Sequence, residues 1–335
     1  MKAARVEAPH ASVMILEVED PLPGPGQVVI RVTASGVCGS DLHVVDGKLG
    51  RTKYPLTLGH EPAGIVHQIG EGVSRFREGD RVLLYPTTGC GTCMFCIGGK
   101  ENLCPAARSY GFEFDGTDAE FALVPSERYL YPLRRLSDAE AAPLACAGVT
   151  AYHAIKNHVV GLAAPGDSVV VVGAGGLGHL AVQMLRALSP AHVMVVDTRE
   201  EKLELAKSLG AEDIMSPSEF GRLTDAARKS RVAAVIDTVG SDQTLSLGFD
   251  TLGTGGRLVV LGAAGGSLNY SGPDAKDRMV AGPILGSLTE MRETLELAEQ
   301  GLVRVVHRDF PLEKVNEVLA MVRGGQVTGR AVLIP

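Results

Sequence analysis

The chain has 335 residues, which is enough for two domains and a large buried core. Its apolar content of 45% and charged content of 21% are ordinary for a globular protein. The net charge of −7 and the lack of any basic run argue against nucleic acid or an anionic membrane as a partner.

Hydrophobic runs are short throughout. None approaches the roughly 20 residues of a membrane helix, and the N-terminus lacks the apolar stretch and cleavage site of a secretory signal. We therefore expect a soluble, cytoplasmic protein.

The N-terminal third predicts a mostly β domain. Short runs rich in Val, Ile and Leu alternate with Gly/Pro turns, a pattern typical of strands. These runs span residues 27–35, 63–70, 80–86 and 119–125.

Two cysteines lie far apart in the sequence, Cys38 in "GVCGSDLH" and Cys146 in "LACAG". His60 and Glu61 lie between them in "GHEPAGIV". Two thiolates and one imidazole can form a catalytic zinc site, which keeps a fourth position open. A lone cysteine is more often a small core residue, and ligands this scattered show no periodicity, so spacing alone leaves both interpretations open.

The other four cysteines fall within fifteen positions, at the spacing C-x2-C-x2-C-x7-C. Disulfides are disfavoured in a reducing cytoplasm. Four unrelated thiols and an iron–sulfur cluster remain as minor alternatives. Thiolates on a tight, glycine-rich loop favour a closed structural zinc site. Its ligands would be Cys90, Cys93, Cys96 and Cys104.

The pattern changes near residue 150. A β-branched run at 168–172 leads into "GAGGLG", a helical stretch follows at 177–188, and a second strand at 192–196 ends at Asp197. A strand, G-x-G-x-x-G, a helix and an acid about 20 residues later predict a dinucleotide-binding unit. The alternative is a glycine-rich turn with Asp197 as a cap.

The glycines have separate roles in such a unit. Gly173 permits the tight turn, Gly175 lets the backbone approach a pyrophosphate, and Gly178 lets the helix pack on the strand. Asp197 would bind the ribose hydroxyls and favour NAD over NADP, although Arg199 could soften that preference.

Strands and helices continue to alternate after Asp197, which predicts a doubly wound parallel sheet. The expected helix covers 200–210, and the expected strands cover 232–237 and 257–262. The tail at 318–335 predicts a helix and then a terminal strand.

Taken together, these motifs resemble the zinc-dependent medium-chain alcohol dehydrogenases over the whole chain. The motifs are "GVCGSDLH", "GHEPAGIV", the cysteine lobe, "CAGVTAY", "GAGGLG" and "GRAVLIP". The resemblance implies an α/β protein with a GroES-like, mostly β catalytic domain and a Rossmann NAD-binding domain. The catalytic domain would cover 1–150 and be completed by 287–335, with the Rossmann domain at 151–286.

The resemblance also implies roles for particular residues around two zinc ions. Cys38, His60 and Cys146 would hold the catalytic zinc, with Glu61 behind the metal and able to enter its coordination. Asp41 would fix the tautomer of His60.

Further roles concern the proton and the cofactor. Ser40 would touch the substrate oxygen, and His43 would pass its proton to solvent. The residues implied in NAD binding are Gly173, Gly175, Gly176, Leu177, Gly178, Asp197, Lys202, Thr150 and Arg330, with Arg330 reaching the pyrophosphate.

The expected reaction is reversible hydride transfer between a primary or secondary alcohol and NAD, giving an aldehyde or ketone. The third zinc ligand would be Cys146, where the polyol branch typically has Glu, so the chain resembles the microbial alcohol dehydrogenase branch. The short chain suggests a tetramer, with a dimer as the alternative. The alternatives are a dehydrogenase of larger polar, polyol or cyclic secondary alcohols, and a non-catalytic NAD-binding structural protein.

Overall fold

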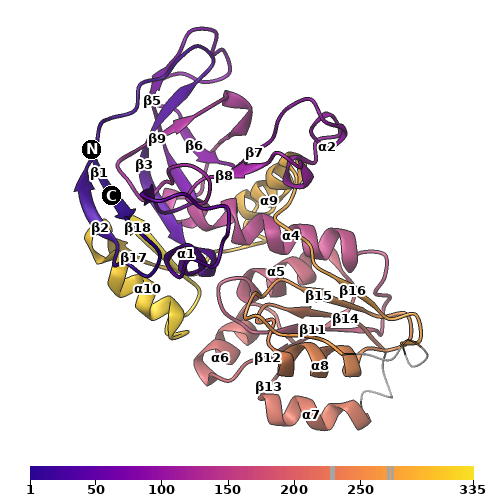
Figure 1. Cartoon of the computed structure of the whole chain (residues 1–335). Coiled ribbons are helices and arrows are strands. Elements are labelled where there is room, and N and C mark those ends of the chain that lie inside the picture. The colour runs from indigo at the N-terminus through magenta and orange to yellow at the C-terminus, as the bar shows by residue number, and fades with distance from the viewer. Residues whose placement is uncertain (227–230, 270–271, 273–274) are drawn as a thin grey trace. The chain divides into compact units, whose positions relative to one another are not determined.

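The structure is a computed structural model that describes residues 1–226, 231–269, 272 and 275–335. The chain divides into two compact units (Figure 1). The first unit comprises residues 1–147, 287–300 and 305–335, and the second comprises 148–286 and 301–304. No helix within the described ranges is both long enough and apolar enough to cross a membrane.

The first unit is built mainly from strands. A seven-stranded sheet has the order β10-β6-β5-β3-β18-β17, with β9 also paired to β3; a three-stranded sheet has the order β2-β1-β4, and β7 pairs with β8. The strands are β1 (Lys2–Val6), β2 (Met14–Glu17), β3 (Val28–Val37), β4 (Leu56–Thr57), β5 (Pro62–Ile69), β6 (Arg81–Leu84), β7 (Thr87–Thr88), β8 (Arg108–Ser109), β9 (Phe121–Val124), β10 (Leu130–Pro132), β17 (His307–Pro311) and β18 (Arg330–Ile334).

Strand β18 lies inside the large sheet although it comes last in the chain. It pairs antiparallel with β3 and parallel with β17, and its first four residues are buried. In Figure 1, β17, β18 and the helix α10 (Val315–Arg323) lie beside the strands of the N-terminal segment. The sheet that contains β3, the strand leading to Cys38, therefore includes a strand formed by residues 330–334.

Short helices complete the first unit. The core beside β18 is formed by aliphatic side chains from β1, α10 and α1 (Gly39–Val45), including Val6, Val44, Val318 and Leu333. The remaining helices are α2 (Met94–Ile97), α3 (Asp138–Ala141) and α9 (Leu288–Glu299).

The second unit has a six-stranded, fully parallel sheet in the order β13-β12-β11-β14-β15-β16. This is the order of a Rossmann fold, in which the first three strands are added toward one edge of the sheet and the next three toward the other edge. The change occurs between β11 and β14, which are neighbours in the sheet. Its elements are α4 (Ala147–His158), β11 (Ser168–Val172), α5 (Gly178–Leu188), β12 (His192–Val196), α6 (Glu200–Ser208), β13 (Asp213–Met215), α7 (Pro217–Ala226), β14 (Val232–Asp237), α8 (Asp242–Thr251), β15 (Arg257–Val260) and β16 (Met279–Ala281).

The sequence of β11 explains its central place in the sheet. All five of its residues are buried, so both of its faces are covered, as in parallel sheets whose strands are continuous apolar runs. Val170 and Val172 on one face belong to a buried cluster with Phe220 of α7 and Phe249 of α8. Figure 1 shows these two helices on the same side of the sheet. The predicted α/β fold class, with a GroES-like domain and a Rossmann sheet, is confirmed.

A bidentate ion pair joins α10 to the end of α1. The Arg323 guanidinium donates to both carboxylate oxygens of Asp46 at 2.6 and 2.9 Å. The hydrogen bonds from Arg323, helped by Lys48, hold the pKa of Asp46 well below its usual range.

We predict that Asp46→Asn lowers the stability of the first unit at pH 7 by about 0.5–1 kcal/mol, the value of a well-aligned surface pair. That loss corresponds to a melting temperature lower by about 1–4 °C. Because the pKa of Asp46 is depressed in the folded state, the wild-type advantage is present above about pH 4 and is lost as the pH falls further. Differential scanning calorimetry at pH 7 and pH 3 measures both effects. An equal deficit in an Arg323→Gln background would contradict this assignment.

Candidate functional site

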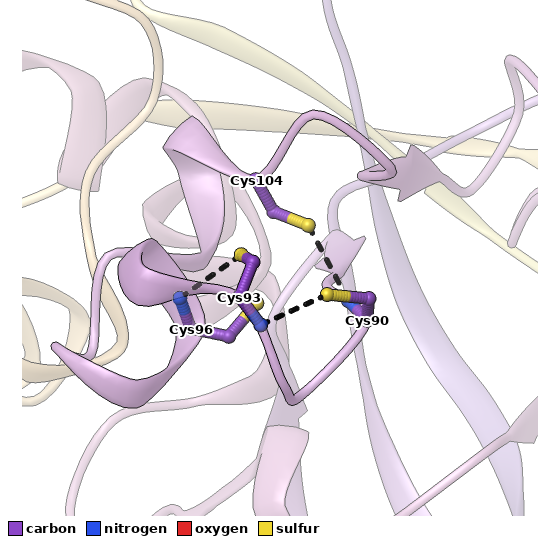
Figure 2. A group of neighbouring side chains, drawn as sticks. All are labelled: Cys90, Cys93, Cys96 and Cys104. Carbon is purple, nitrogen blue, oxygen red and sulfur yellow. Dashed lines mark hydrogen bonds between the residues drawn. The ribbon is translucent and has the colours of Figure 1, made fainter.

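The four clustered cysteines converge on one point in the first unit. Their sulfur atoms all lie within 4.8 Å of one another, and Figure 2 shows the four side chains gathered at the turn around α2. Two glycines with left-handed backbones, Gly91 (φ 78°) and Gly99 (φ 71°), bend the loop on either side of α2. The four cysteines that the sequence predicts as one zinc site therefore lie close enough together to share an ion.

Backbone N–H groups donate to the sulfurs of this cluster. The N–H of Cys93 points to Cys90 Sγ at 3.4 Å, and the N–H of Cys96 points to Cys93 Sγ at 3.5 Å (Figure 2). Hydrogen bonds from the backbone N–H groups of Thr92 and Cys93 lower the pKa of Cys90 to about 6, whereas burial raises the pKa of Cys96 to about 12. Four thiolates this close need a cation between them, which fits structural zinc.

An ion pair between a buried carboxylate and a partly exposed arginine lies next to the lobe. Glu101 is 1% exposed and pairs with Arg128, whose N–H donates to Glu101 Oε1. Gly89 makes room for the lobe, because a Cβ there would lie 2.5 Å from Cys96 Sγ. Sequence spacing gave no signal for this support.

The second cluster brings together residues from three parts of the chain. Ligand atoms of Cys38, His60, Glu61 and Cys146 all lie within 4.8 Å of one another. Cys38 follows β3, His60 and Glu61 precede β5, and Cys146 follows a 3-10 turn at Ala142–Ala145. Pairing of β3 with β5 therefore joins two of the three ligand segments.

Asp41 links two members of this cluster. Its Oδ2 accepts the N–H of Cys38 at 2.8 Å, and its Oδ1 lies 3.0 Å from Nδ1 of His60. A carboxylate only accepts, so in the neutral imidazole Nδ1 of His60 carries the proton and Nε2 keeps a lone pair. The Nε2 atom is buried and has no hydrogen-bond partner. An orphaned, oriented imidazole nitrogen beside two thiols is what a zinc ligand requires.

The charges in this cluster also favour a cation. The hydrogen bond with Cys146, aided by His60, lowers the pKa of Cys38 well below its usual value, while the same bond raises the pKa of Cys146. Burial opposes the charged form of His60, but Asp41 and Cys38 outweigh it and raise its pKa. The donor set thus attracts positive charge at the centre of the four side chains.

Glu61 stands behind the ligands and pairs with Arg330. Glu61 is fully buried and Arg330 is 6% exposed, so the ion pair is inside the unit. Burial raises the pKa of Glu61 to about 7 although Arg330 opposes the shift. Gly36 admits this carboxylate, because a Cβ there would lie 2.1 Å from Glu61 Oε2. The role expected for Arg330, at the pyrophosphate, did not include this pairing.

The two remaining residues predicted in this region lie on α1. Cys38 Sγ is 3.7 Å from Ser40 Oγ, and His43 lies half-buried one turn further along the helix. Phe112, which the sequence analysis also missed, contacts the ring of His60 with centroids 4.9 Å apart. No spacing signal could have indicated it, because it belongs to an irregular loop.

The glycine loop lies in the second unit between β11 and α5. Gly173 has a left-handed φ of 88°, and a Cβ on Gly178 would lie 1.9 Å from the carbonyl oxygen of Gly173. Each glycine therefore occupies a position that a larger residue would strain or block. Gly176 and Leu177 form the half-buried turn that leads into α5.

Asp197 lies at the end of β12, next to this loop. Its carboxylate accepts the N–H of Ala174 at 2.7 Å and the N–H of Arg199 at 3.0 Å. The Lys202 ammonium lies 3.9 Å from the point that a Cβ on Gly175 would occupy. Thr150 is half-buried on α4. The loop, Asp197, Lys202 and Thr150 thus belong to the second unit, whereas Arg330 belongs to the first.

Comparisons with known proteins identify two family matches along the chain. Residues 24–135 match the family described as "Alcohol dehydrogenase GroES-like domain", and residues 176–300 match "Zinc-binding dehydrogenase". An NAD-dependent alcohol dehydrogenase of Sulfurisphaera tokodaii is 38% identical over 96% of each chain.

Two solved structures are similar over the full chain. The alcohol dehydrogenase of the archaeon Aeropyrum pernix has a TM-score of 0.94 at 37% identity, with 100% of each chain covered. A thermostable alcohol dehydrogenase of Pyrobaculum aerophilum, solved with cobalt and zinc bound, has a TM-score of 0.90 at 30% identity, covering 100% of this chain and 99% of the other. This chain therefore belongs to the zinc-containing, NAD-dependent medium-chain alcohol dehydrogenases.

Proposed function

We propose that this chain oxidises primary or secondary alcohols reversibly to aldehydes or ketones at a zinc ion held by Cys38, His60 and Cys146. The observation that carries the proposal is the buried, unpaired Nε2 of His60, which Asp41 orients toward two thiols. Three protein ligands leave one position for the substrate oxygen.

Zinc, when bound, supplies a Lewis acid that lowers the pKa of an alcohol oxygen. A carboxylate oxygen of Glu61 lies within 4.8 Å of the ligand atoms of the other three side chains, and Arg330 forms an ion pair with the same carboxylate. We infer that this pairing keeps Glu61 as a reserve ligand.

Ser40 and His43 would move the proton. Ser40 lies beside Cys38 at the start of α1, so its hydroxyl can accept the proton of an alcohol held next to the thiols. His43 lies one turn along the same helix, and its imidazole would take a proton from the Ser40 hydroxyl and release it to solvent.

NAD, when bound, supplies the hydride acceptor. The backbone of Gly173, Gly175, Gly176 and Gly178 and the start of α5 would hold its pyrophosphate. Asp197, assisted by Lys202, would bind the adenosine ribose, and Leu177 and Thr150 would pack against the nicotinamide. The assignment of Arg330 to the pyrophosphate stays a prediction.

We assign the first compact unit as the catalytic domain and the second as the NAD-binding domain. Both groups of candidate metal ligands lie wholly in the first unit, and the glycine loop lies wholly in the second. The limits of the two compact units support domain boundaries near 150 and 287, and residues 301–304 belong to the second unit.

We propose a homo-oligomer, as a tetramer or dimer, in the cytoplasm. Strand β16 ends the parallel sheet, and its Met279 and Val280 are 49% and 48% exposed. An apolar edge strand is a surface on which a second copy can pair.

The six cysteines form no disulfide bonds, which favours a reducing compartment. Analytical ultracentrifugation and cell fractionation test these two assignments, and a monomer or an exported protein would contradict them.

The activity is tested by absorbance at 340 nm with zinc-loaded protein. The panel contains primary, secondary, cyclic and polyol substrates, each with NAD and with NADP. We expect turnover with NAD, and a weaker response with NADP because Asp197 repels a 2′-phosphate. Silence with every substrate while NADH still binds would favour a non-catalytic NAD-binding protein.

We predict that Cys146→Ser lowers turnover at least 1000-fold, because a thiolate ligand is lost where charge must be stabilised. NADH binding, followed by fluorescence, should change less than about twofold, since Cys146 lies outside the NAD-binding unit. Persistence of activity would disprove the ligand assignment.

We predict two zinc ions per wild-type chain and one in Cys104→Ser. The Cys104 variant removes one of four converging sulfurs, so the lobe around α2 loses its cross-link and the melting temperature falls. Metal analysis by mass spectrometry gives the count. Cys146→Ser serves as the matched control, because it removes a sulfur from the other cluster.

A further inference from the structure

Asp118 is a buried carboxyl group that the proposed mechanism does not use. It lies between β8 and β9 and is 1% exposed. Among the described residues no Lys, Arg or His forms an ion pair with it. Burial, reinforced by the negative charge of Asp41, raises the pKa of Asp118 to about 8. A buried acid without a cation is costly, so its retention calls for a physical reason.

One contact of Asp118 reaches the strand that carries Cys38. Ser35 Oγ donates to Asp118 Oδ1 at 2.6 Å, and Thr117 Oγ1 lies 3.3 Å from the same hydroxyl. Ser35 and Thr117 are fully buried. Ser35 precedes Cys38 by three residues on β3, so this bond fixes the end of the strand from which Cys38 projects.

A second contact reaches the turn that carries His60. Gly59 has a left-handed φ of 92°, and a Cβ there would lie 2.2 Å from Asp118 Oδ1. The carboxyl group therefore packs directly on the backbone that precedes His60. Two backbone bonds reinforce the contact, since Asp118 N donates to Leu58 O at 2.8 Å and Thr117 N donates to Gly59 O at 3.0 Å.

We propose that Asp118 is a positioning residue of the catalytic metal centre, whose side chain sets the spacing between the Cys38 end of β3 and the Gly59–His60 turn. The proposal depends on the assignment of Cys38 and His60 as zinc ligands. This role of Asp118 needs a hydrogen-bond acceptor of the right size at Oδ1, and it does not need a negative charge on the side chain. Residues that orient metal ligands typically change metal affinity by 10- to 100-fold when they are removed.

Two substitutions separate this role from general packing. Asp118→Asn keeps the Oδ1 acceptor for Ser35 and should retain catalytic zinc within about threefold of wild type. Asp118→Leu fills a similar volume without an acceptor, and it should release that zinc about 10- to 100-fold faster to a chelator. The four-cysteine zinc in the same molecule is an internal control and should be unaffected.

Asp138→Leu is the matched control. Its carboxylate also accepts a hydroxyl from β3, Thr33 Oγ1 at 2.6 Å, and it pairs with Arg81. Within the described ranges the Asp138 carboxylate bonds to Thr33 and Arg81 and not to the Gly59–His60 turn, so its loss can destabilise the unit but should leave the release of catalytic zinc at the wild-type rate.

Cobalt substituted at the catalytic position provides a spectroscopic readout. We expect the visible ligand-field bands to shift in Asp118→Leu and to match wild type in Asp118→Asn and Asp138→Leu. If Asp118→Leu does not fold, Ser35→Ala decides, because it removes the same bond and keeps the carboxyl group. Faster release of catalytic zinc from Ser35→Ala supports the proposal, and wild-type release overturns it.

The result separates this proposal from the proposed function. Two zincs in wild type, with wild-type release and cobalt spectra in Asp118→Leu, overturn the positioning role alone. A single zinc in wild type, unchanged by Cys146→Ser, overturns the catalytic-site assignment and the positioning role with it.

Discussion

The hydrogen bonds of Asp41 are the interaction on which the catalytic centre depends. One carboxylate accepts from the Cys38 backbone and faces Nδ1 of His60, so it starts helix α1 and sets the imidazole tautomer together. Without the Asp41 carboxylate, nothing would favour the tautomer of His60 that leaves Nε2 unprotonated. Cys38 would also lose the hydrogen bond that fixes its backbone N–H. The order of the site begins in a single buried side chain.

Burial of opposite charges explains the rest of the centre. Glu61 would be costly inside the unit without Arg330, and Arg330 would be equally costly without Glu61 and the thiols. The ligands, Asp41 and Glu61 therefore form one electrostatic group, in which each carboxylate has an assigned counter-charge. Asp118 differs, because it holds its place through a hydroxyl and a glycine backbone.

Local patterns in the sequence predicted much of this molecule. The run "SVVVV", the glycine loop and Asp197 are close in sequence, and the structure places them as a strand, a turn and a strand end. The four clustered cysteines were likewise predictable, since short spacing on a loop brings side chains together. The pairing of Glu61 with Arg330 was not, because 269 positions separate them and only the insertion of β18 beside β3 joins them. Phe112 and Asp118 lie in irregular backbone, where no periodicity reports what a side chain touches.

The place of β18 has a consequence for how the chain is made. Residues 330–334 pair with β3 inside the large sheet, and Arg330 supplies the counter-charge of Glu61. During synthesis from the N-terminus, almost all of the parallel-sheet unit emerges before the first sheet has this strand. The second unit can therefore fold while the first unit still lacks strand β18 and, with it, the counter-charge of Glu61. Completion of the catalytic centre therefore requires residues that are synthesised after the whole of the second unit.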